Sequence, residues 1–195
     1  MSKIAFFDFD GTLTYKDTML DFIRFMVGTK RFILGIFRCA PMLLAFKLGF
    51  VSNNRAKEYF LTHFLEGVDE QYFKESAKRY SLSQIDSLLR PKAIERIKWH
   101  KEQGDYIVIV SASMKSWLAP WCSREGVALI STALEFSKGK CTGKLETPNC
   151  YGEEKVKRIL HEYDLNNYTE TYAYGDTSGD KPMLSLVDHA YYRHF

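Results

Sequence analysis

The chain alternates between short apolar runs and longer stretches in which apolar residues recur with helical spacing. The first run, residues 4–7 (Ile-Ala-Phe-Phe), contains no alternation with polar residues, so it predicts a strand that is buried on both faces of a sheet. Further strands are predicted, in chain order, at 106–110, 127–131, 171–175 and 190–192. A small hairpin is predicted from 134–136 and 141–145.

Helical patterns separate these strands. The predicted helices run over 17–27, 53–65, 69–80, 82–89, 91–103, 115–124, 152–160 and 182–187. Asp17 and Ser113 are expected to cap two of them, and Pro91 suits the first residue of another. Because strands alternate with helical crossovers, we expect an α/β fold with a parallel sheet and helices on both faces. We expect a core of residues 1–15 and 91–195, with an all-helical domain, residues 16–90, inserted after the first strand.

Residues 32–51 form the most apolar part of this insertion. Arg38 and Lys47 interrupt the segment, and Pro41 is expected to break or kink a helix. The uncharged run 39–46 is too short to span a membrane. One interpretation is a helical hairpin that packs on itself or on the core. The other is an apolar surface that lies on a membrane or holds a lipid tail.

Charge in the insertion bears on the second interpretation. Residues 22–65 contain seven lysines and arginines and a single acid, Glu58. A basic and apolar helical segment is typical of proteins that contact an anionic membrane surface.

Composition narrows the class of protein. The 195 residues carry a net charge of only +3, from 27 basic and 24 acidic residues, which argues against nucleic acid as a partner. The four cysteines form no CxxC pair, so we expect free thiols in a reducing compartment, that is, a cytoplasmic protein, peripheral to the membrane if the insertion binds lipid. The first strand begins almost at once, which leaves no room for a signal peptide.

Polar residues gather where the predicted strands end. Asp8 and Asp10 follow the first strand two positions apart, so both project from one side. Gly11 and Thr12 come next, and a glycine lets backbone amides approach an anion. Two carboxylates buried together repel each other unless a cation shares them. Mg²⁺, a hard cation that prefers oxygen ligands, fits such a site.

Three later positions repeat this arrangement. Ser111 ends the second apolar run, and Asp176 and Asp180 follow the strand at 171–175. Lys155 lies in the first turn of a helix, where a cation is disfavoured, so a nearby anion would explain it.

Together these motifs resemble the haloacid-dehalogenase superfamily of phosphohydrolases. Residues 8–14 (Asp-Phe-Asp-Gly-Thr-Leu-Thr) are similar to its first motif, Ser111 to its second, Lys155 to its third and residues 175–180 to its fourth. The helical insertion resembles the cap of the phosphoserine-phosphatase-like branch (subfamily IB). The resemblance implies a Rossmann-like core with an inserted helical cap.

The resemblance also implies a role for each residue. Asp8 would be the nucleophile that forms an aspartyl phosphate, and Asp10 the general acid and then the general base. Mg²⁺ would be bound by Asp8, the backbone carbonyl of Asp10 and Asp176, with Asp180 and Thr12 orienting these groups. Ser111, the amide of Ala112 and Lys155 would bind the phosphoryl oxygens. A carboxylate can approach a phosphate ester only when cations offset the repulsion, which agrees with this assignment.

The substrate is less well defined. A small phosphate monoester, such as a phosphometabolite or a phosphoserine-like compound, is the first expectation. Asp17 stands near the position of an acid that recognises serine in phosphoserine phosphatases, but Gly179 stands where that branch often has Asn. The basic, apolar insertion also resembles that of bacterial phosphatidylglycerophosphate phosphatases, which act on a lipid phosphate.

Two non-enzymatic alternatives remain. A phospho-receiver also combines acids, a Ser or Thr and a Lys at strand ends, but its acceptor acid lies mid-chain and it lacks a cap. A catalytically silent relative that binds lipid or phosphate is the other alternative, although every catalytic position is filled here.

Overall fold

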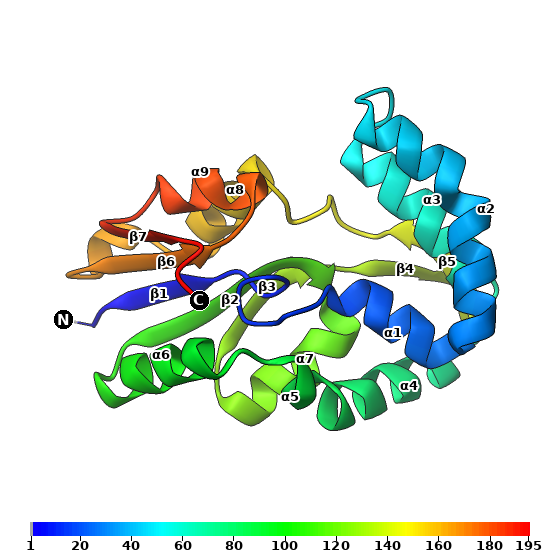
Figure 1. Cartoon of the computed structure of the whole chain (residues 1–195). Helices are drawn as coiled ribbons and strands as arrows, with labels where there is room; N and C mark the ends of the chain where they lie inside the picture. Colours follow the sequence, from blue (N-terminus) through cyan, green and yellow to red (C-terminus); the bar gives the residue numbers. More distant parts are fainter. Residues whose placement is uncertain (1) are drawn as a thin grey trace.

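The computed structural model describes residues 2–195 and contains a five-stranded sheet in the order β3-β2-β1-β6-β7. All neighbouring strands in it pair in parallel. Its strands are β1 (Ile4–Phe7), β2 (Tyr106–Met114), β3 (Ala128–Thr132), β6 (Thr171–Gly175) and β7 (His189–Tyr192). Helices cover both faces of the sheet (Figure 1), so the predicted fold class is confirmed.

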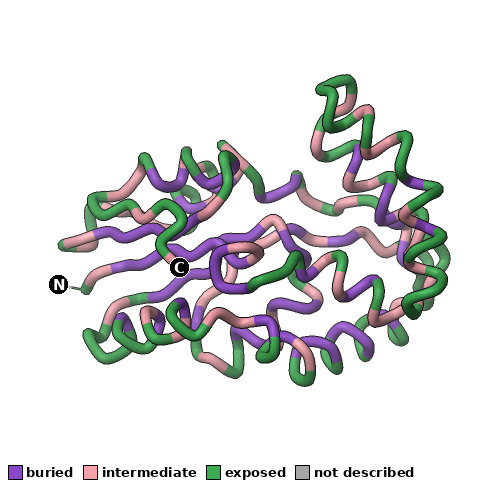
Figure 2. The backbone as a smooth tube through the Cα atoms, in the orientation of Figure 1, coloured by how far each residue is buried: buried purple, intermediate pink, exposed green. Residues whose placement is uncertain are grey.

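The central strand β1 is buried over its whole length, as the apolar run predicts. Ala5 and Phe7 belong to one hydrophobic cluster, and Ile4 and Phe6 belong to the other, on the opposite face. Figure 2 shows the same burial along the neighbouring strands. Because successive side chains of a strand point to opposite faces, β1 joins both layers of the core.

The long connection from β1 to β2 is helical. Its helices are α1 (Thr18–Val27), α2 (Thr29–Lys47), α3 (Asn53–Leu65), α4 (Glu70–Ser83), α5 (Ile85–Leu88) and α6 (Pro91–Glu102). α2 and α3 rise beside the sheet at the right of Figure 1. The remaining helices are α7 (Lys115–Glu125), α8 (Glu153–Glu162) and α9 (Lys181–Leu184), with short 3₁₀ turns at Leu165–Asn167 and Ser178–Asp180.

The segment around Pro41 differs from the expectation of a break. α2 continues through Pro41, which lies on the exposed side of the helix. Proline leaves the carbonyl of Phe37 without its intrahelical donor, and on this side water can supply one. A single long helix therefore replaces the hairpin that we considered within residues 32–51.

A two-stranded hairpin connects the sheet with the inserted helices. It is formed by β4 (Leu134–Ser137) and β5 (Lys140–Leu145), and β5 packs against α3. The fit is close, because a Cβ on Gly143 would lie 2.3 Å from the Cα of Thr62. Among residues 2–195, none of the helices combines the length and apolar character that a membrane-spanning segment requires.

Candidate active site

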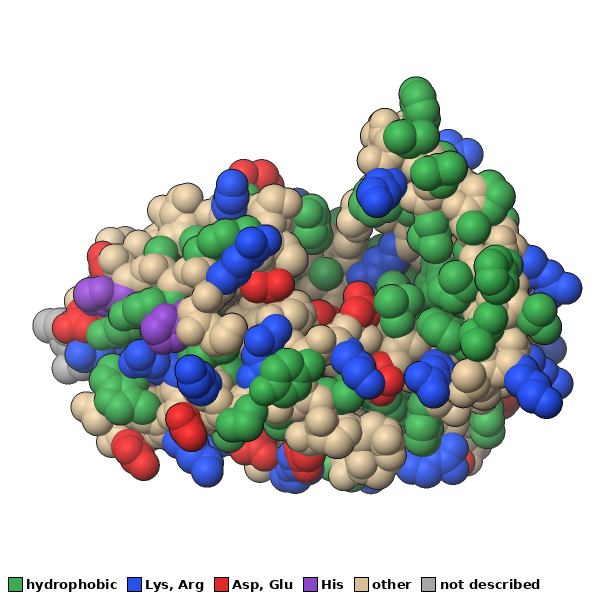
Figure 3. Space-filling model, in the orientation of Figure 1, with side chains coloured by type: hydrophobic (Ala, Val, Ile, Leu, Met, Phe, Trp, Pro, Cys, Tyr) green, Lys and Arg blue, Asp and Glu red, His purple; other side chains and the backbone are tan. Residues whose placement is uncertain are grey.

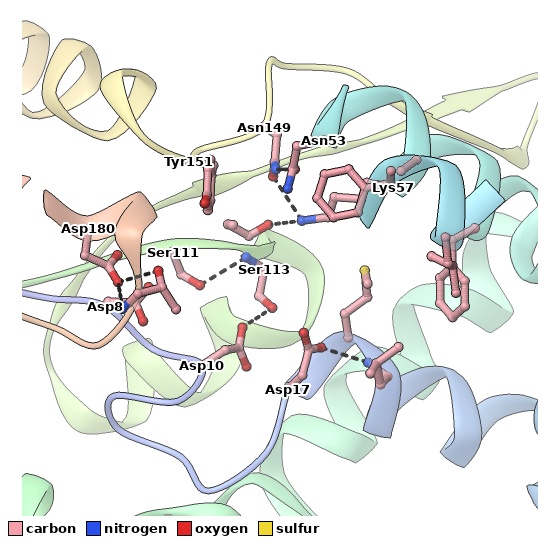
Figure 4. Close-up of a pocket in the computed structure, with 18 of the residues that line it drawn as sticks. Asp8, Asp10, Asp17, Asn53, Lys57, Ser111, Ser113, Asn149, Tyr151 and Asp180 are labelled. Atoms are coloured by element: carbon pink, nitrogen blue, oxygen red, sulfur yellow. Dashed lines mark hydrogen bonds between the residues drawn. The ribbon is translucent and has the colours of Figure 1, made fainter. Parts of the chain in front are cut away.

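The predicted site residues converge at the carboxyl edge of the sheet. Asp8 directly follows β1 and Asp176 directly follows β6, its parallel neighbour. Ser111 lies within β2, whose register shifts just after this residue. In an open parallel sheet this edge is where ligands bind. The structure thus brings together residues that are more than 160 positions apart in the chain (Figure 4).

Lys155 occupies the centre of this cluster. Its Nζ donates to Asp8 Oδ1 at 2.6 Å, to Asp180 Oδ1 at 2.7 Å and to the carbonyl of Val110 at 2.8 Å. The side chain is only 1% exposed. Burial lowers the pKa of Lys155, but the carboxylates of Asp8 and Asp180 outweigh burial and hold the pKa above its usual value. The ammonium is therefore charged, as a phosphate-binding lysine must be.

Carboxylates outnumber cations at this place. Asp8, Asp176 and Asp180 offer oxygens that all lie within 4.8 Å of one another. Burial raises the pKa of Asp8 to about 7, although Lys155 acts in the opposite direction. A second cation would favour the ionised carboxylate that a nucleophile requires. An all-oxygen donor set with excess negative charge fits Mg²⁺.

The oxygens of the three acids are not equally free. Both oxygens of Asp180 are used, because Oδ1 accepts from Lys155 and Oδ2 accepts from the amides of Asp176 and Thr177. Thr12 donates to Asp176 Oδ1 at 2.9 Å and is 3.1 Å from Asp8 Oδ2. Asp180 therefore orients the turn and Lys155, whereas Asp8 and Asp176 retain oxygens for a metal.

Gly11 shapes the loop between these acids. Its φ of +86° lies in the region that favours glycine, and a Cβ there would lie 2.5 Å from Asp176 Oδ2. The backbone of the first motif therefore passes Asp176 more closely than any other residue type would allow.

Asp10 is held on two sides and lies apart from the lysine. Its Oδ1 accepts from the amide of Thr18 at 2.7 Å, and its Oδ2 accepts a short hydrogen bond from Ser113 Oγ. Burial, with the charge of Asp17, raises the pKa of Asp10 to about 6. A carboxyl group with such a pKa can both give and take a proton near neutral pH.

Ser113 does not have the role of helix cap that the sequence predicts. It does not cap α7, because β2 continues to Met114, which is the residue at the N-cap position and makes no side-chain cap bond. Ser113 is buried, and its hydroxyl is turned toward Asp10. Its amide donates to Ser111 Oγ at 3.0 Å, so Ser113 also helps to fix the predicted phosphate-binding serine.

A cavity of about 420 Å³ extends from these residues toward the inserted helices. The acids, Ser111, Ala112 and Lys155 line one end. The other end is lined mainly by apolar side chains from α1, α2 and α3, namely Met19, Leu20, Ile36, Leu43, Phe46, Ala56 and Phe60. The hollow is visible in Figure 3 between the two parts of the molecule.

Lys57, on α3, is a residue of this cavity that the sequence analysis did not select. Its Nζ donates to the carbonyl of Ala112 at 2.6 Å and to Asn149 Oδ1 at 2.9 Å. Asn149 in turn donates to Asn53 Oδ1 at 2.6 Å, which ties α3 to the loop before α8. Burial lowers the pKa of Lys57 to about 8. The signal available in the sequence was helical spacing, which places Lys57 on the same face of the helix as Asn53 and Phe60.

Asp17 and Gly179 are the two positions that bear on a phosphoserine-like substrate. Asp17 lines the cavity and also caps α1 by accepting from the amide of Leu20 at 3.0 Å. At Gly179, a Cβ would lie 2.1 Å from the ring of Tyr151. Tyr151 therefore fills the space that an Asn side chain would need, which gives a physical reason for the departure in the fourth motif.

The family model for haloacid dehalogenase-like hydrolases matches residues 5–185. The chain belongs to this family. Protein CicA of Caulobacter vibrioides is 36% identical over 191 residues, covering 97% of this chain and 85% of CicA. A probable phosphatase of Mycobacterium tuberculosis is 28% identical over 193 residues, covering 95% and 67%. The predicted family and the prediction of a phosphatase-type hydrolase are confirmed.

Solved structures of other proteins share the fold. A Bordetella pertussis protein of unknown function aligns with a TM-score of 0.82 at 24% identity, covering 96% of this chain and 87% of that one. A phospho-aspartyl intermediate analogue of phosphoserine phosphatase aligns with a TM-score of 0.68 at 20% identity, covering 95% and 83%. At these identities the likeness concerns the fold.

Proposed function

We propose that this hydrolase is a Mg²⁺-dependent phosphatase that cleaves a phosphate monoester through an aspartyl phosphate on Asp8. The observation that carries the proposal is the cluster at the sheet edge, in which Asp8 contacts Lys155 and lies beside Asp176 and Asp180. A dianionic phosphate can approach such acids only when cations offset their charge.

The chain's own residues account for each step. A carboxylate oxygen of Asp8 attacks phosphorus, and the bond from phosphorus to the ester oxygen breaks. Asp10 gives its proton to the departing oxygen. Asp10 then takes a proton from a water that attacks the aspartyl phosphate, which releases inorganic phosphate and restores Asp8. The pKa of about 6 suits both transfers.

Binding groups surround the reacting phosphoryl group. Ser111, the amide of Ala112 and Lys155 would hold its oxygens. Mg²⁺ would be held by Asp8, Asp176 and the backbone carbonyl of Asp10, and when bound it offsets the charge of the phosphate and of the acids. Asp180 and Thr12 keep Lys155, Asp8 and Asp176 in place through the hydrogen bonds described above.

We also propose the domain division expected from the sequence, with residues 1–15 and 91–195 as the core and 16–90 as the cap. The helices of this cap form the apolar end of the cavity. The cap would thus contact the part of the substrate that does not react.

A small phosphate monoester is the first candidate substrate, and phosphoserine phosphatases among the fold neighbours act on one. A lipid phosphate is the second candidate, because the cap end of the cavity is mainly apolar. Few ionic groups at this end could bind the ammonium and carboxylate of an amino acid. Within the described part of residues 16–90, Asp17 and Lys57 are the charged residues that line the cavity.

The test is release of phosphate from p-nitrophenyl phosphate and from a panel of soluble and lipid monoesters. We expect activity that is lost in EDTA, restored by Mg²⁺ and poorly supported by Ca²⁺, whose larger shell can bind both oxygens of a carboxylate. Full turnover in excess chelator would contradict the metal assignment.

The matched variant is Asp8→Asn, whose amide nitrogen cannot attack phosphorus. We expect loss of turnover in a folded protein, judged by circular dichroism. Normal turnover of the folded variant would remove Asp8 from its role. A wild-type protein that releases no phosphate from any monoester would favour the silent relative.

A further inference from the structure

Helix α2 presents an apolar surface that the rest of the chain does not cover. Of its nineteen residues, only Gly35 and Cys39 are buried within the described chain. The large exposed apolar side chains of α2 and the turn after it are Ile33, Leu34, Phe37, Leu44, Phe46, Leu48 and Phe50. Phe37 is 72% exposed and Phe50 is 81% exposed. Contiguous apolar surface of this kind marks a contact site.

Four exposed residues of α2 follow the helical repeat. Ile33, Phe37, Ala40 and Leu44 are spaced so that they form one stripe along the outer side of α2. Gly35 and Cys39 lie on the opposite side, where α2 packs against α1 and α3. The stripe is therefore a separate face of the helix. Figure 3 shows hydrophobic side chains gathered over this region.

Exposed cations lie on the same helix. Residues 29–50 contain Lys30, Arg31, Arg38 and Lys47 and no acid. All four are exposed, and within residues 2–195 none of them forms an ion pair. The surface thus combines apolar side chains with uncompensated positive charge.

We propose that this face of α2, with the turn through Phe50, docks on the surface of an anionic lipid bilayer. Its cations match the phosphates of anionic lipids, and its apolar stripe can enter the interface between headgroups and acyl chains. A second copy of the chain is a poorer occupant. A symmetric contact through this face would bring together two surfaces that carry cations and no acid.

Docking would also place the cavity at the bilayer. Ile36, Leu43 and Phe46 belong to α2 and line the cavity. One side of the bound helix would therefore face the lipid surface, and another side would line the cavity. Access of an amphiphilic phosphate ester from the bilayer to Asp8 rests on the proposed function; the docking itself does not.

The test is flotation of the full chain with phosphatidylglycerol-containing vesicles and with neutral phosphatidylcholine vesicles at low and high salt. We expect binding to the anionic vesicles at low salt that falls at least about tenfold at high salt, because screening weakens the attraction. Binding to neutral vesicles should be weaker under both conditions.

Matched variants separate this face from general surface changes. Phe37→Ser/Phe50→Ser should reduce flotation about tenfold or more, whereas Leu82→Ser/Leu160→Ser, on exposed positions of α4 and α8, should not. Lys30→Glu/Lys47→Glu, which reverses the two charges next to Ile33 and Leu44, should abolish it. Lys78→Glu/Lys98→Glu makes the same change of charge at exposed positions of α4 and α6 and should leave most of it.

Three outcomes would overturn the proposal. They are no binding to anionic vesicles at low salt, equal binding to neutral vesicles, and self-association in solution that the Phe37→Ser/Phe50→Ser variant removes. Turnover of p-nitrophenyl phosphate is measured in parallel. Because none of the altered residues belongs to the catalytic cluster, normal turnover with lost flotation separates a failure of docking from a failure of the proposed chemistry.

Discussion

The two ends of the cavity are built differently. At the core end, a cation and two acids bond one another directly, as Lys155 does with Asp8 and Asp180. At the cap end, Lys57 bonds two neutral oxygens, and most side chains that line this end are apolar. The core end is thus a hydrogen-bonded cluster in which acids outnumber cations, and the cap end contains one cation without an acid bonded to it.

This difference separates chemistry from selection. The hydrogen bonds at the core end hold Asp8, Asp180 and Lys155 in one geometry. Fixed charges of this kind can stabilise the charge that develops around phosphorus in the transition state. A partly apolar chamber with a single cation serves recognition of the rest of the substrate. Changes at the core end should therefore affect turnover, and changes at the cap end should affect apparent affinity.

After Asp8→Asn, the largest effect is expected for Asp10→Asn. Loss of a general acid and base lowers turnover about 10²- to 10⁴-fold. With p-nitrophenyl phosphate the leaving group needs little help from an acid, but hydrolysis of the aspartyl phosphate still needs the base. Rapid-mixing measurements should therefore show a burst of one equivalent of p-nitrophenol, followed by slow turnover.

Asp8→Asn is the control for this burst, because it cannot form the aspartyl phosphate. A burst in Asp8→Asn, or unchanged steady turnover in Asp10→Asn, would show that the two acids are not divided between nucleophile and proton transfer as we propose.

A smaller effect is expected for Gly11→Ala. The new Cβ would meet Asp176 Oδ2 and force a strained φ, whereas Gly104→Ala introduces a similar φ problem with nothing within 4 Å. Both variants should lose about 1–3 kcal/mol of stability in urea unfolding. Only Gly11→Ala should also weaken activation by Mg²⁺, measured as the concentration for half-maximal activity. Equal Mg²⁺ dependence in the two variants would contradict the proposed place of Asp176 in the metal site.

Much of the fold was predictable because its signals are local. The run at residues 4–7 is buried on both faces as expected, and the helices between β1 and β2 follow the predicted order. The break predicted at Pro41 is wrong, because helix propensity does not tell which side of a helix faces water. The core end of the candidate site was likewise predictable, since strand ends in a parallel sheet meet at one edge.

The cap end was not predictable in this way. Lys57 and Asn149 meet only because α3 packs against β5 and beside the loop before α8. The prediction that Ser113 caps a helix is wrong, because the direction of its side chain depends on where β2 ends. Contacts that depend on tertiary packing leave little trace in local sequence patterns.

Lys57 gives the smallest and most selective effect. We expect its ammonium to bind an anionic group of the substrate, so Lys57→Met should raise KM about tenfold to a hundredfold, the value of a charge-assisted hydrogen bond. Because Lys57 bonds Ala112 and Asn149 rather than Asp8 or Asp10, kcat should change less than KM. A KM that stays unchanged would mean that Lys57 serves only to tie α3 to Ala112 and Asn149.

The pH dependence distinguishes binding from a purely structural role. Burial lowers the pKa of Lys57 to about 8, so its charge is present below that pH and is lost as pH rises through it. KM of the wild type should therefore rise above about pH 8. Lys57→Arg, which keeps its charge over the whole range, should lack this rise, and Lys57→Met should show the higher KM at every pH. An alkaline rise in KM that persists in both variants would assign the titration to another group.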